Sequence, residues 1–402
     1  MPKNISNAYL TLMTIRESGY KTSTAIAELV DNAIEANAND IDIISLSENI
    51  IGSKRASLNV TKIAVLDNGD GMPAEILEDC LALGWGTRLD GTSGSLGKFG
   101  YGLKASSVSQ GRRVEVYSWQ NIDWSNKDPK NIKVNMTSLD LDIIEDTNQE
   151  KLDELVLQKM PEDISQRFGY KINKSPSGTL VIWSKLDNIG FKKVVALTNS
   201  LNEDLCKIYR FYLHGGEFGN KRNICIQDVN LNTKETNQIA LVANDPMYLM
   251  TPNNLPSYSD QATNELTDSF SVSVEYTDLS GNIAKSKYDI RLSIAKPEIQ
   301  DLGGNSTQGR HYEKNTGISF IRAGREIGFG TYGFTTSSEP RNRWWGMEIL
   351  FNPELDKLFG VTNNKQEVTK VRALSDSMKK DLLEDELTQE EQFLLNLNNY
   401  IN

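Results

Sequence analysis

ELVDNA, residues 28–33, is the stretch that decides the fold, and it lies within a helical pattern that begins at Thr24. Apolar residues recur there every three or four positions, while Glu28 and Asn32 lie on the polar face. Ser23 is the expected N-cap. Glu28 and Asn32 are one helical turn apart, about 40° around the axis and roughly 6 Å along it, so both side chains address one small volume. The spacing suits a metal–phosphate site, in which an amide oxygen ligates Mg²⁺ and a carboxylate activates a water; a solvated helix face is the alternative.

A tight turn closes the second strand-like run. After the strand pattern of residues 62–66, residues 67–72 read DNGDGM, which places a carboxylate at the strand end and two glycines behind it. Asp67 can accept a hydrogen bond from an exocyclic amine such as adenine N6, and Gly69 and Gly71 let the backbone approach a flat ring. A plain hairpin and a calcium loop are the alternatives. A calcium loop counted from Asp67 would have glycines at its third and fifth positions, where oxygen ligands are required, so calcium is disfavoured.

A glycine-rich segment follows the turn. Residues 84–88 read GWGTR, and residues 97–104 read GKFGYGLK. Backbone amides in such a run can cradle phosphate oxygens, a helix beginning near Gly102 would add its positive end, and Lys98 or Lys104 would add charge. The run lacks the first glycine and the final serine or threonine of a Walker A loop, and its glycines are not spaced as in a dinucleotide fingerprint. A flexible surface loop is the alternative.

The composition defines the class of protein. The chain has 402 residues, of which 38% are apolar and 24% charged, and this predicts a globular protein with two domains plus appendages. The formal charge of -11 disfavours nucleic-acid binding through global charge but is compatible with a local basic groove. The sequence shows no basic leader with an apolar stretch and no membrane-length apolar run, so we expect a soluble, cytoplasmic protein without membrane association.

The patterns along the chain predict a mixed α/β layer and then a second α/β domain. Strand-like runs occupy residues 41–46, 63–66, 114–119, 134–141 and 179–183. We expect a connecting helix at residues 192–213, with strands resuming near residues 224, 271–276, 288–294 and 317–321. Residues 244–267 are expected to form a long loop or insertion, and the residues after 367 a polar helical tail.

Taken together and in this order, the three blocks resemble the N, G1 and G2 boxes of the GHKL ATPases, which include gyrase, MutL, histidine kinases and the large heat-shock chaperones. Gly178-Thr179-Leu180, on a predicted strand, fits the last box of that family, and the whole set looks closest to the MORC ATPases. The resemblance implies an α/β fold of the α+β sandwich type. The implied domains are a Bergerat-fold ATP-binding domain at residues 1–190, a transducer-like (ribosomal-protein-like) α/β domain at 191–366 and a helical tail at 367–402.

The resemblance also implies roles for individual residues. Glu28 would be the general base, Asn32 the Mg²⁺ ligand, and Asp67, supported by Thr179, the acceptor for adenine. Residues 360–366, GVTNNKQ, look like the MORC transducer segment whose lysine reaches the terminal phosphate, so Lys365 is the candidate sensor and second catalytic residue. The remaining residues expected to bind ATP are Gly69, Gly71, Met72, Gly97, Lys98, Phe99, Gly100, Tyr101, Gly102, Leu103 and Lys104.

The function implied is Mg²⁺-dependent binding and slow hydrolysis of ATP, driving a conformational switch with a nucleotide-dependent homodimer. DNA, a protein client or a place in a defence system are open as partners. The chain shows no coiled-coil arm or zinc-finger pattern, so a chromatin role is not carried over. One alternative is a non-hydrolytic, nucleotide-gated clamp. Another is a histidine-kinase-type phosphotransferase, which is disfavoured because neither His214 nor His311 lies in a helical segment ahead of the nucleotide domain.

Overall fold

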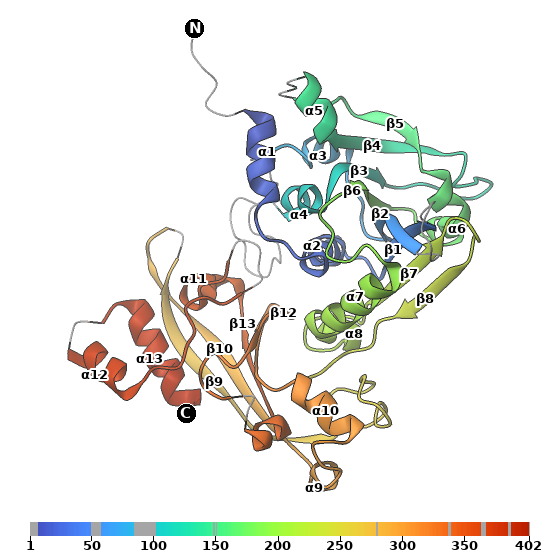
Figure 1. Ribbon diagram of the computed structural model, residues 1–402. Coiled ribbons are helices and arrows are strands. Elements are labelled where there is room, and N and C mark those ends of the chain that lie inside the picture. Colours follow the sequence, from blue (N-terminus) through green and yellow to red (C-terminus); the bar gives the residue numbers. More distant parts are fainter. Residues whose placement is uncertain are drawn as a thin grey trace. The chain divides into compact units, whose positions relative to one another are not determined.

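The computed structural model describes residues 7–49, 58–83, 102–147, 149, 151–278, 280–336, 339–362, 367–384 and 387–401 (Figure 1). Backbone contacts divide the chain into two compact units. The first unit contains the described residues up to Leu205 together with Arg222–Leu241, and the second contains Cys206–Lys221 and the described residues from Val242 onward. No helix within these described ranges is long and apolar enough to cross a membrane.

The first unit is built on a mixed sheet with the strand order β5-β4-β3-β6-β2-β1-β7-β8. Neighbouring strands in it are antiparallel, except that β1 and β7 run parallel. The strands are β1 Asp40–Asn49, β2 Leu58–Asp67, β3 Gly111–Trp119, β4 Lys133–Asp140, β5 Val156–Lys159, β6 Gly178–Leu186, β7 Asn223–Asn230 and β8 Thr236–Ala240. The helices are α1 Ala8–Arg16, α2 Thr22–Glu35, α3 Ala74–Asp79, α4 Gly102–Gln110, α5 Leu141–Thr147, α6 Glu162–Ile172 and α7 Val194–Ile208, whose last turn belongs to the second unit.

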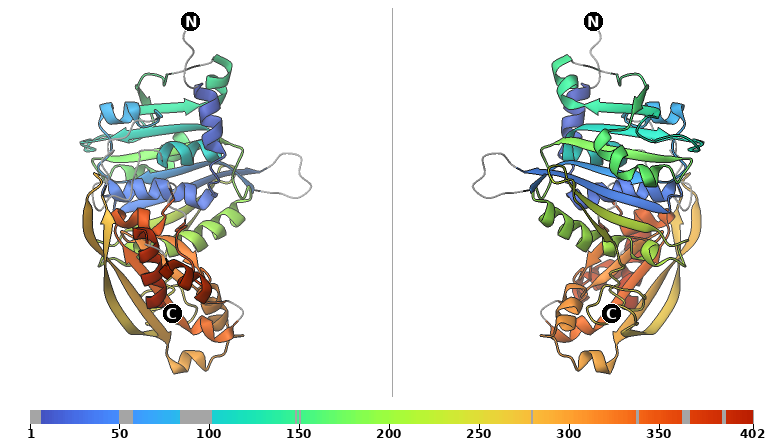
Figure 2. Two further views of the ribbon diagram at one scale, coloured as in Figure 1. Left: turned by 90° about the vertical axis from the view of Figure 1, so that its left-hand side faces the viewer. Right: turned by 90° about the vertical axis from the view of Figure 1, so that its right-hand side faces the viewer.

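Helices cover both faces of this sheet (Figure 2). On one face α2 and α4 pack against each other and against the central strands, and the indole of Trp183 in β6 donates to Ser107 Oγ in α4 at 2.8 Å. The other face is covered by α6, whose Ile172 packs in one core cluster with Leu66 of β2. Successive side chains of a strand point to opposite faces, so Asp67, next to Leu66, faces α2 and α4.

Helix α2 begins earlier than the sequence pattern indicates. Its first residue is Thr22 and its N-cap is Lys21, which makes no side-chain capping bond, so the expectation that Ser23 is the N-cap is wrong. The Thr22 hydroxyl instead donates to Gln110 Oε1 at 2.8 Å and accepts from the Gly190 amide at 2.9 Å. Contacts with distant segments, rather than a local cap, therefore fix the start of this helix.

The second unit has its own sheet, with the order β12-β11-β13-β10-β9. The C-terminal helix α13 supplies Phe393 and Leu397 to the core cluster on this sheet, where they join Tyr288, Phe320 and Phe359. The segment expected to be a polar tail thus contributes to the core. The elements are α8 Arg210–His214, β9 Asn264–Thr277, β10 Ile283–Ala295, α9 Pro297–Gln300, α10 Thr307–Lys314, β11 Ile318–Arg322, β12 Arg325–Gly330, β13 Trp345–Phe351, α11 Asp356–Phe359, α12 Asp376–Glu384 and α13 Gln389–Ile401, with 3-10 turns at Pro340–Trp344 and Pro353–Leu355.

The division into units differs from the boundary expected at residue 190. Strand β7 pairs in parallel with β1, from Asp40 opposite Asn223 onward, and β8 pairs with β7. The chain therefore leaves the first unit after Leu205 and returns to its sheet for residues 222–241. The strand pattern near residue 224 was correct, but periodicity alone does not specify the sheet that a strand joins.

A buried arginine pairs with three carboxylates in the second unit. Arg210 is fully buried and forms ion pairs with Glu326, with Glu348 at 3.1 Å and with Asp245 at 3.7 Å. All three carboxylates are themselves buried. Removing one partner from such a group leaves uncompensated charge in a low-dielectric interior, which is strongly destabilising.

Candidate functional site

Asp67 ends β2 on the face of α2 and α4, and its carboxylate is held by neighbouring backbone. The side chain is buried, and its Oδ1 accepts from the Gly69 amide at 2.8 Å. Burial raises the pKa of Asp67 to about 7, against the opposing effect of hydrogen bonds from the Gly69 and Thr179 amides. Thr179, which is also buried, lies opposite Asp67 in the β2–β6 pair. When ionised, the Asp67 carboxylate can only accept hydrogen bonds, so its partners must be donors such as an amine.

The turn after Asp67 needs its glycines. A Cβ on Gly69 would lie 2.6 Å from the Ala36 carbonyl oxygen, and one on Gly71, whose φ is +67°, would lie 2.3 Å from that of Trp119. The Asp70 amide donates to the Ala36 oxygen at 2.7 Å. Strand, turn and the end of α2 are thereby held in close contact, and a side chain at either glycine would separate them.

The carboxylate of Glu28 lies against the first residue of α4. Glu28 is 3% exposed, and a Cβ placed on Gly102 would lie 2.3 Å from its Oε2 atom. Only a glycine at position 102 allows this approach, and the start of a helix carries partial positive charge that stabilises a carboxylate. One turn further along α2, Asn32 is exposed. Of the two side chains expected to act together, Glu28 is therefore buried, and Asn32 is accessible to solvent.

Lys104, one of the two lysines of the glycine-rich run, is a buried residue of α4. Lys104 is 2% exposed, and burial lowers its pKa, whereas the electrostatic influence of Cys80 and Asp79 raises it. The thiol of Cys80 is itself shielded from solvent, which raises its pKa to about 12. Leu103, before Lys104 in the helix, is half-buried. A direct contact of Lys104 with phosphate stays a prediction.

The sequence analysis did not identify Ser118, whose side chain contacts both the turn after Asp67 and the start of β6. Its hydroxyl accepts from the Met72 amide at 2.7 Å and lies 3.2 Å from the Gly178 carbonyl oxygen and 3.4 Å from Thr179 Oγ1. The side chain is fully buried. No local motif marks this serine, because only the pairing of β3 with β6 brings it opposite Thr179.

Several candidate residues lie outside the described residues. From the glycine-rich run these are Gly97, Lys98, Phe99, Gly100 and Tyr101, and from the second unit Lys365. Their assigned roles stay predictions. Among the described candidates, Glu28 lies against Gly102, and a second group contains Asp67, Gly69, Gly71, Met72 and Thr179. The other described candidates, Asn32, Leu103 and Lys104, lie in helices α2 and α4, which carry Glu28 and Gly102.

The sequence also matches a known family over the part of the chain that carries these groups. Residues 20–179 fit the profile of the family described as "Histidine kinase-, DNA gyrase B-, and HSP90-like ATPase". Residues 20–179, within the first unit, are therefore similar to the ATP-binding domain of the GHKL class. This confirms the resemblance that the order of the three sequence blocks indicated.

Among individual proteins, the chain is similar to two from Arabidopsis thaliana. It is 30% identical over 95 residues to Protein MICRORCHIDIA 1 and 32% identical over 96 residues to Protein MICRORCHIDIA 7, which confirms the resemblance to MORC ATPases. Each match covers 23% of this chain but only 14% and 13% of those proteins. A solved structure described as the N terminal domain of a DNA repair protein covers 96% of this chain and 97% of its own, with 16% identity and a TM-score of 0.48.

Proposed function

We propose that the first unit binds ATP with Mg²⁺ on the face of α2 and α4 and hydrolyses it slowly. The observation that carries this proposal is the close approach of the Glu28 carboxylate to Gly102, where the glycine-rich run leads into α4. A helix start at the end of such a run is a favourable place for phosphate oxygens. In this proposal Glu28 takes a proton from a water that attacks the terminal phosphate, which is the role of a general base.

The donor atoms at this end of α2 fit a magnesium ion. The amide oxygen of Asn32 is exposed, and Mg²⁺ prefers oxygen ligands and retains several waters when it binds phosphates. When bound, Mg²⁺ would neutralise charge on the phosphate oxygens. The chain would contribute Asn32 as a ligand and Glu28 as the base, one helical turn apart.

We propose that the adenine ring of the nucleotide binds at the second group of residues, around Asp67 and Thr179. Asp67 would accept a hydrogen bond from the exocyclic amine of adenine, and Thr179 would support the ring. Ser118 would keep the Met72 amide and β6 in place around this acceptor, as a positioning residue without contact to the nucleotide. The glycines at positions 69 and 71 would let the ring approach the backbone.

We also propose that ATP hydrolysis is coupled to a conformational switch. Lys365 is the proposed sensor of the terminal phosphate, and its assignment rests on the resemblance of residues 360–366 to the MORC segment. A nucleotide-dependent homodimer is proposed on the same resemblance. Binding energy that differs between the ATP-bound and product states is what would drive such a switch.

The test compares Glu28→Gln with Glu35→Gln, which removes a carboxylate from the same helix. For Glu28→Gln we expect ATP binding to be retained and phosphate release to fall roughly 10² to 10⁴ fold, the usual contribution of a general base. Glu35→Gln should release phosphate at the rate of the unchanged protein. Equal turnover in both variants would sink the assignment of Glu28.

Measuring the solution mass with ATP and with a non-hydrolysable analogue distinguishes a hydrolytic switch from a non-hydrolytic, nucleotide-gated clamp. Dimer formation with the analogue, together with phosphate release from ATP, supports a hydrolytic switch. Full dimerisation without detectable phosphate release would favour the non-hydrolytic clamp. The same samples with and without DNA show whether DNA changes either quantity.

The phosphotransferase alternative has no support from the described histidines. His311 Nδ1 lies 2.9 Å from the Tyr248 hydroxyl, and burial lowers the pKa of His311 to about 4. The ring also packs edge-on against Tyr248. A stably labelled chain after incubation with γ-labelled ATP would nevertheless decide for a kinase.

A further inference from the structure

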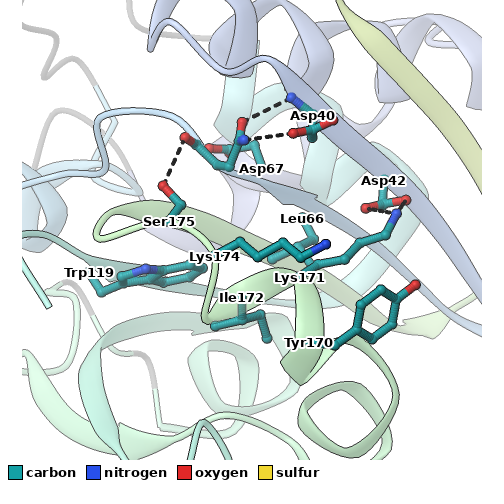
Figure 3. Close-up of a pocket in the computed structure, with 11 residues that line it drawn as sticks. Asp40, Asp42, Leu66, Asp67, Trp119, Tyr170, Lys171, Ile172, Lys174 and Ser175 are labelled. Carbon is teal, nitrogen blue, oxygen red and sulfur yellow. Dashed lines mark hydrogen bonds and ion pairs between the residues drawn. The ribbon is translucent and has the colours of Figure 1, made fainter. Parts of the chain in front are cut away.

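The turn that carries Asp67 is fixed by one side chain to the start of β1, that is, to Asn39 and Asp40. Asn68 Oδ1 accepts from the amides of Asn39 and Asp40, both at 2.9 Å. Its Nδ2 atom donates to the Asp40 carboxylate at 2.9 Å, and its backbone amide donates to the Asp40 carbonyl oxygen at 3.3 Å (Figure 3). Asn68 lies between Asp67 and Gly69, whose amide donates to the Asp67 carboxylate. These bonds therefore fix the backbone around the proposed adenine acceptor.

The start of β1 also holds the chain where it returns from the second unit. Arg222 is the first residue of the returning segment, and its Nη1 atom donates to Asn39 Oδ1 at 2.6 Å. Asn223, the first residue of β7, donates through Nδ2 to Asp40 Oδ1 at 3.0 Å and through its amide to the Asn39 carbonyl oxygen at 2.8 Å. The returning segment and the turn after Asp67 therefore share their hydrogen-bond partners.

The carboxylate of Asp40 joins these two segments directly. Its Oδ2 atom accepts from Asn68, and its Oδ1 atom accepts from Asn223. A carboxylate can accept from both amides at once through its two oxygens, whereas an asparagine in its place would offer only one oxygen. Both bonds are exposed to solvent, where water competes for the same groups, so each contributes modestly. We therefore expect effects of several-fold from this connection.

We propose that Arg222 and Asn223 are positioning residues for the adenine acceptor, so that adenine binding at Asp67 and the anchoring of the returning segment strengthen each other. A ligand on Asp67 restrains the turn, the turn restrains the start of β1 through Asn68, and the start of β1 retains the returning segment. Coupling between two sites is reciprocal, so each end responds to the other. This coupling rests on the proposed adenine site and extends it to the point where the chain returns from the second unit.

Hydrogen exchange of individual amides, followed by ¹H–¹⁵N NMR, tests the connection without nucleotide. Asn68→Ala should speed exchange of the Asn223 amide roughly fivefold, because it removes three side-chain hydrogen bonds that hold the start of β1. The control is the Leu231 amide, which donates to the Ser47 carbonyl oxygen at 2.9 Å at the opposite end of the β1–β7 pair. Its exchange should not change.

Adenosine is the probe for the coupling itself. At saturation it should slow exchange of the Asn223 amide about fivefold, the lower end of the range usual for coupled sites, and leave Leu231 unchanged. In calorimetry, Arg222→Gln should weaken adenosine binding about threefold, the lower end of what one hydrogen bond contributes. The matched control is Arg167→Gln, which should bind adenosine normally. Arg167 also donates through Nη1, to the Lys234 carbonyl oxygen at 2.8 Å in the turn between β7 and β8.

The possible results distinguish this coupling from the proposed ATP site. Adenosine binding with unchanged exchange at Asn223, or equal adenosine affinities in Arg222→Gln and Arg167→Gln, would overturn the coupling and leave the ATP site standing. Unchanged Asn223 exchange in Asn68→Ala would overturn the connection through the start of β1. Absence of adenosine binding in the unchanged protein would overturn the proposed site and the coupling with it. Both arginines are partly exposed, so their variants keep the test decisive if Asn68→Ala does not fold.

Discussion

Adenosine binding should weaken roughly tenfold when the pH is lowered from 8 to 6. The proposed acceptor of the adenine amine is Asp67, and burial holds its pKa at about 7. With that pKa, about nine tenths of the carboxyls are ionised at pH 8 and about one tenth at pH 6. An ionised carboxylate only accepts hydrogen bonds, so it suits the amine better than the protonated acid, and affinity should follow the ionised fraction.

The assay is isothermal titration calorimetry at half-unit steps of pH. Adenosine is the probe because it has no phosphate, so the titration of phosphate groups does not contribute. Inosine is the matched ligand: it carries a carbonyl in place of the amine, which can accept from the protonated acid, so its affinity should rise as the pH falls. In Asp67→Asn the adenosine profile should be flat, since the amide does not titrate.

Two outcomes would refute this reasoning. One is an adenosine affinity that does not change between pH 6 and 8 in the unchanged protein. The other is an Asp67→Asn variant that keeps the pH dependence, because the titrating group would then be a different residue. Parallel adenosine and inosine profiles would also contradict the assignment of Asp67 to the amine.

Three further substitutions test other parts of the structure. Gly102→Ala should lower phosphate release at least tenfold, because the added Cβ would lie 2.3 Å from Glu28 Oε2. The control is Gly169→Ala, whose Cβ would make only ordinary contacts, the nearest at 3.6 Å. Equal rates of phosphate release in the two variants would contradict the proposed site. Ser118→Ala should weaken adenosine binding about five- to tenfold in calorimetry, since it removes a hydrogen bond of about 1–1.5 kcal/mol; unchanged affinity would remove its positioning role. Arg210→Met should lower the free energy of unfolding in urea by about 3–5 kcal/mol, because it removes the arginine that pairs with the buried Glu326 and leaves Glu348 with Arg291 alone. A loss below about 1 kcal/mol would show that these carboxylates do not depend on Arg210.

The nucleotide-binding class could be predicted from the sequence because its signals are local. The helical period around Glu28, the strand before Asp67 and the glycines at positions 69 and 71 each lie within a few residues of one another. Such signals follow from the geometry of a single helix or turn, which does not depend on the rest of the chain. Their order along the chain was sufficient to predict the family that the comparison then confirmed.

The state of each site residue depended on segments far apart in the sequence. Glu28 is buried because α4 packs on α2, and Asp67 has a raised pKa because the sheet and its covering helices remove it from water. Ser118 faces Thr179 only through the pairing of β3 with β6, 61 residues further along the chain. The same reason explains why the sequence pattern did not predict that β7 joins the first sheet. The sequence by itself determined which motifs the chain carries, whereas long-range pairing and burial decided which of their groups meet and how those groups are charged.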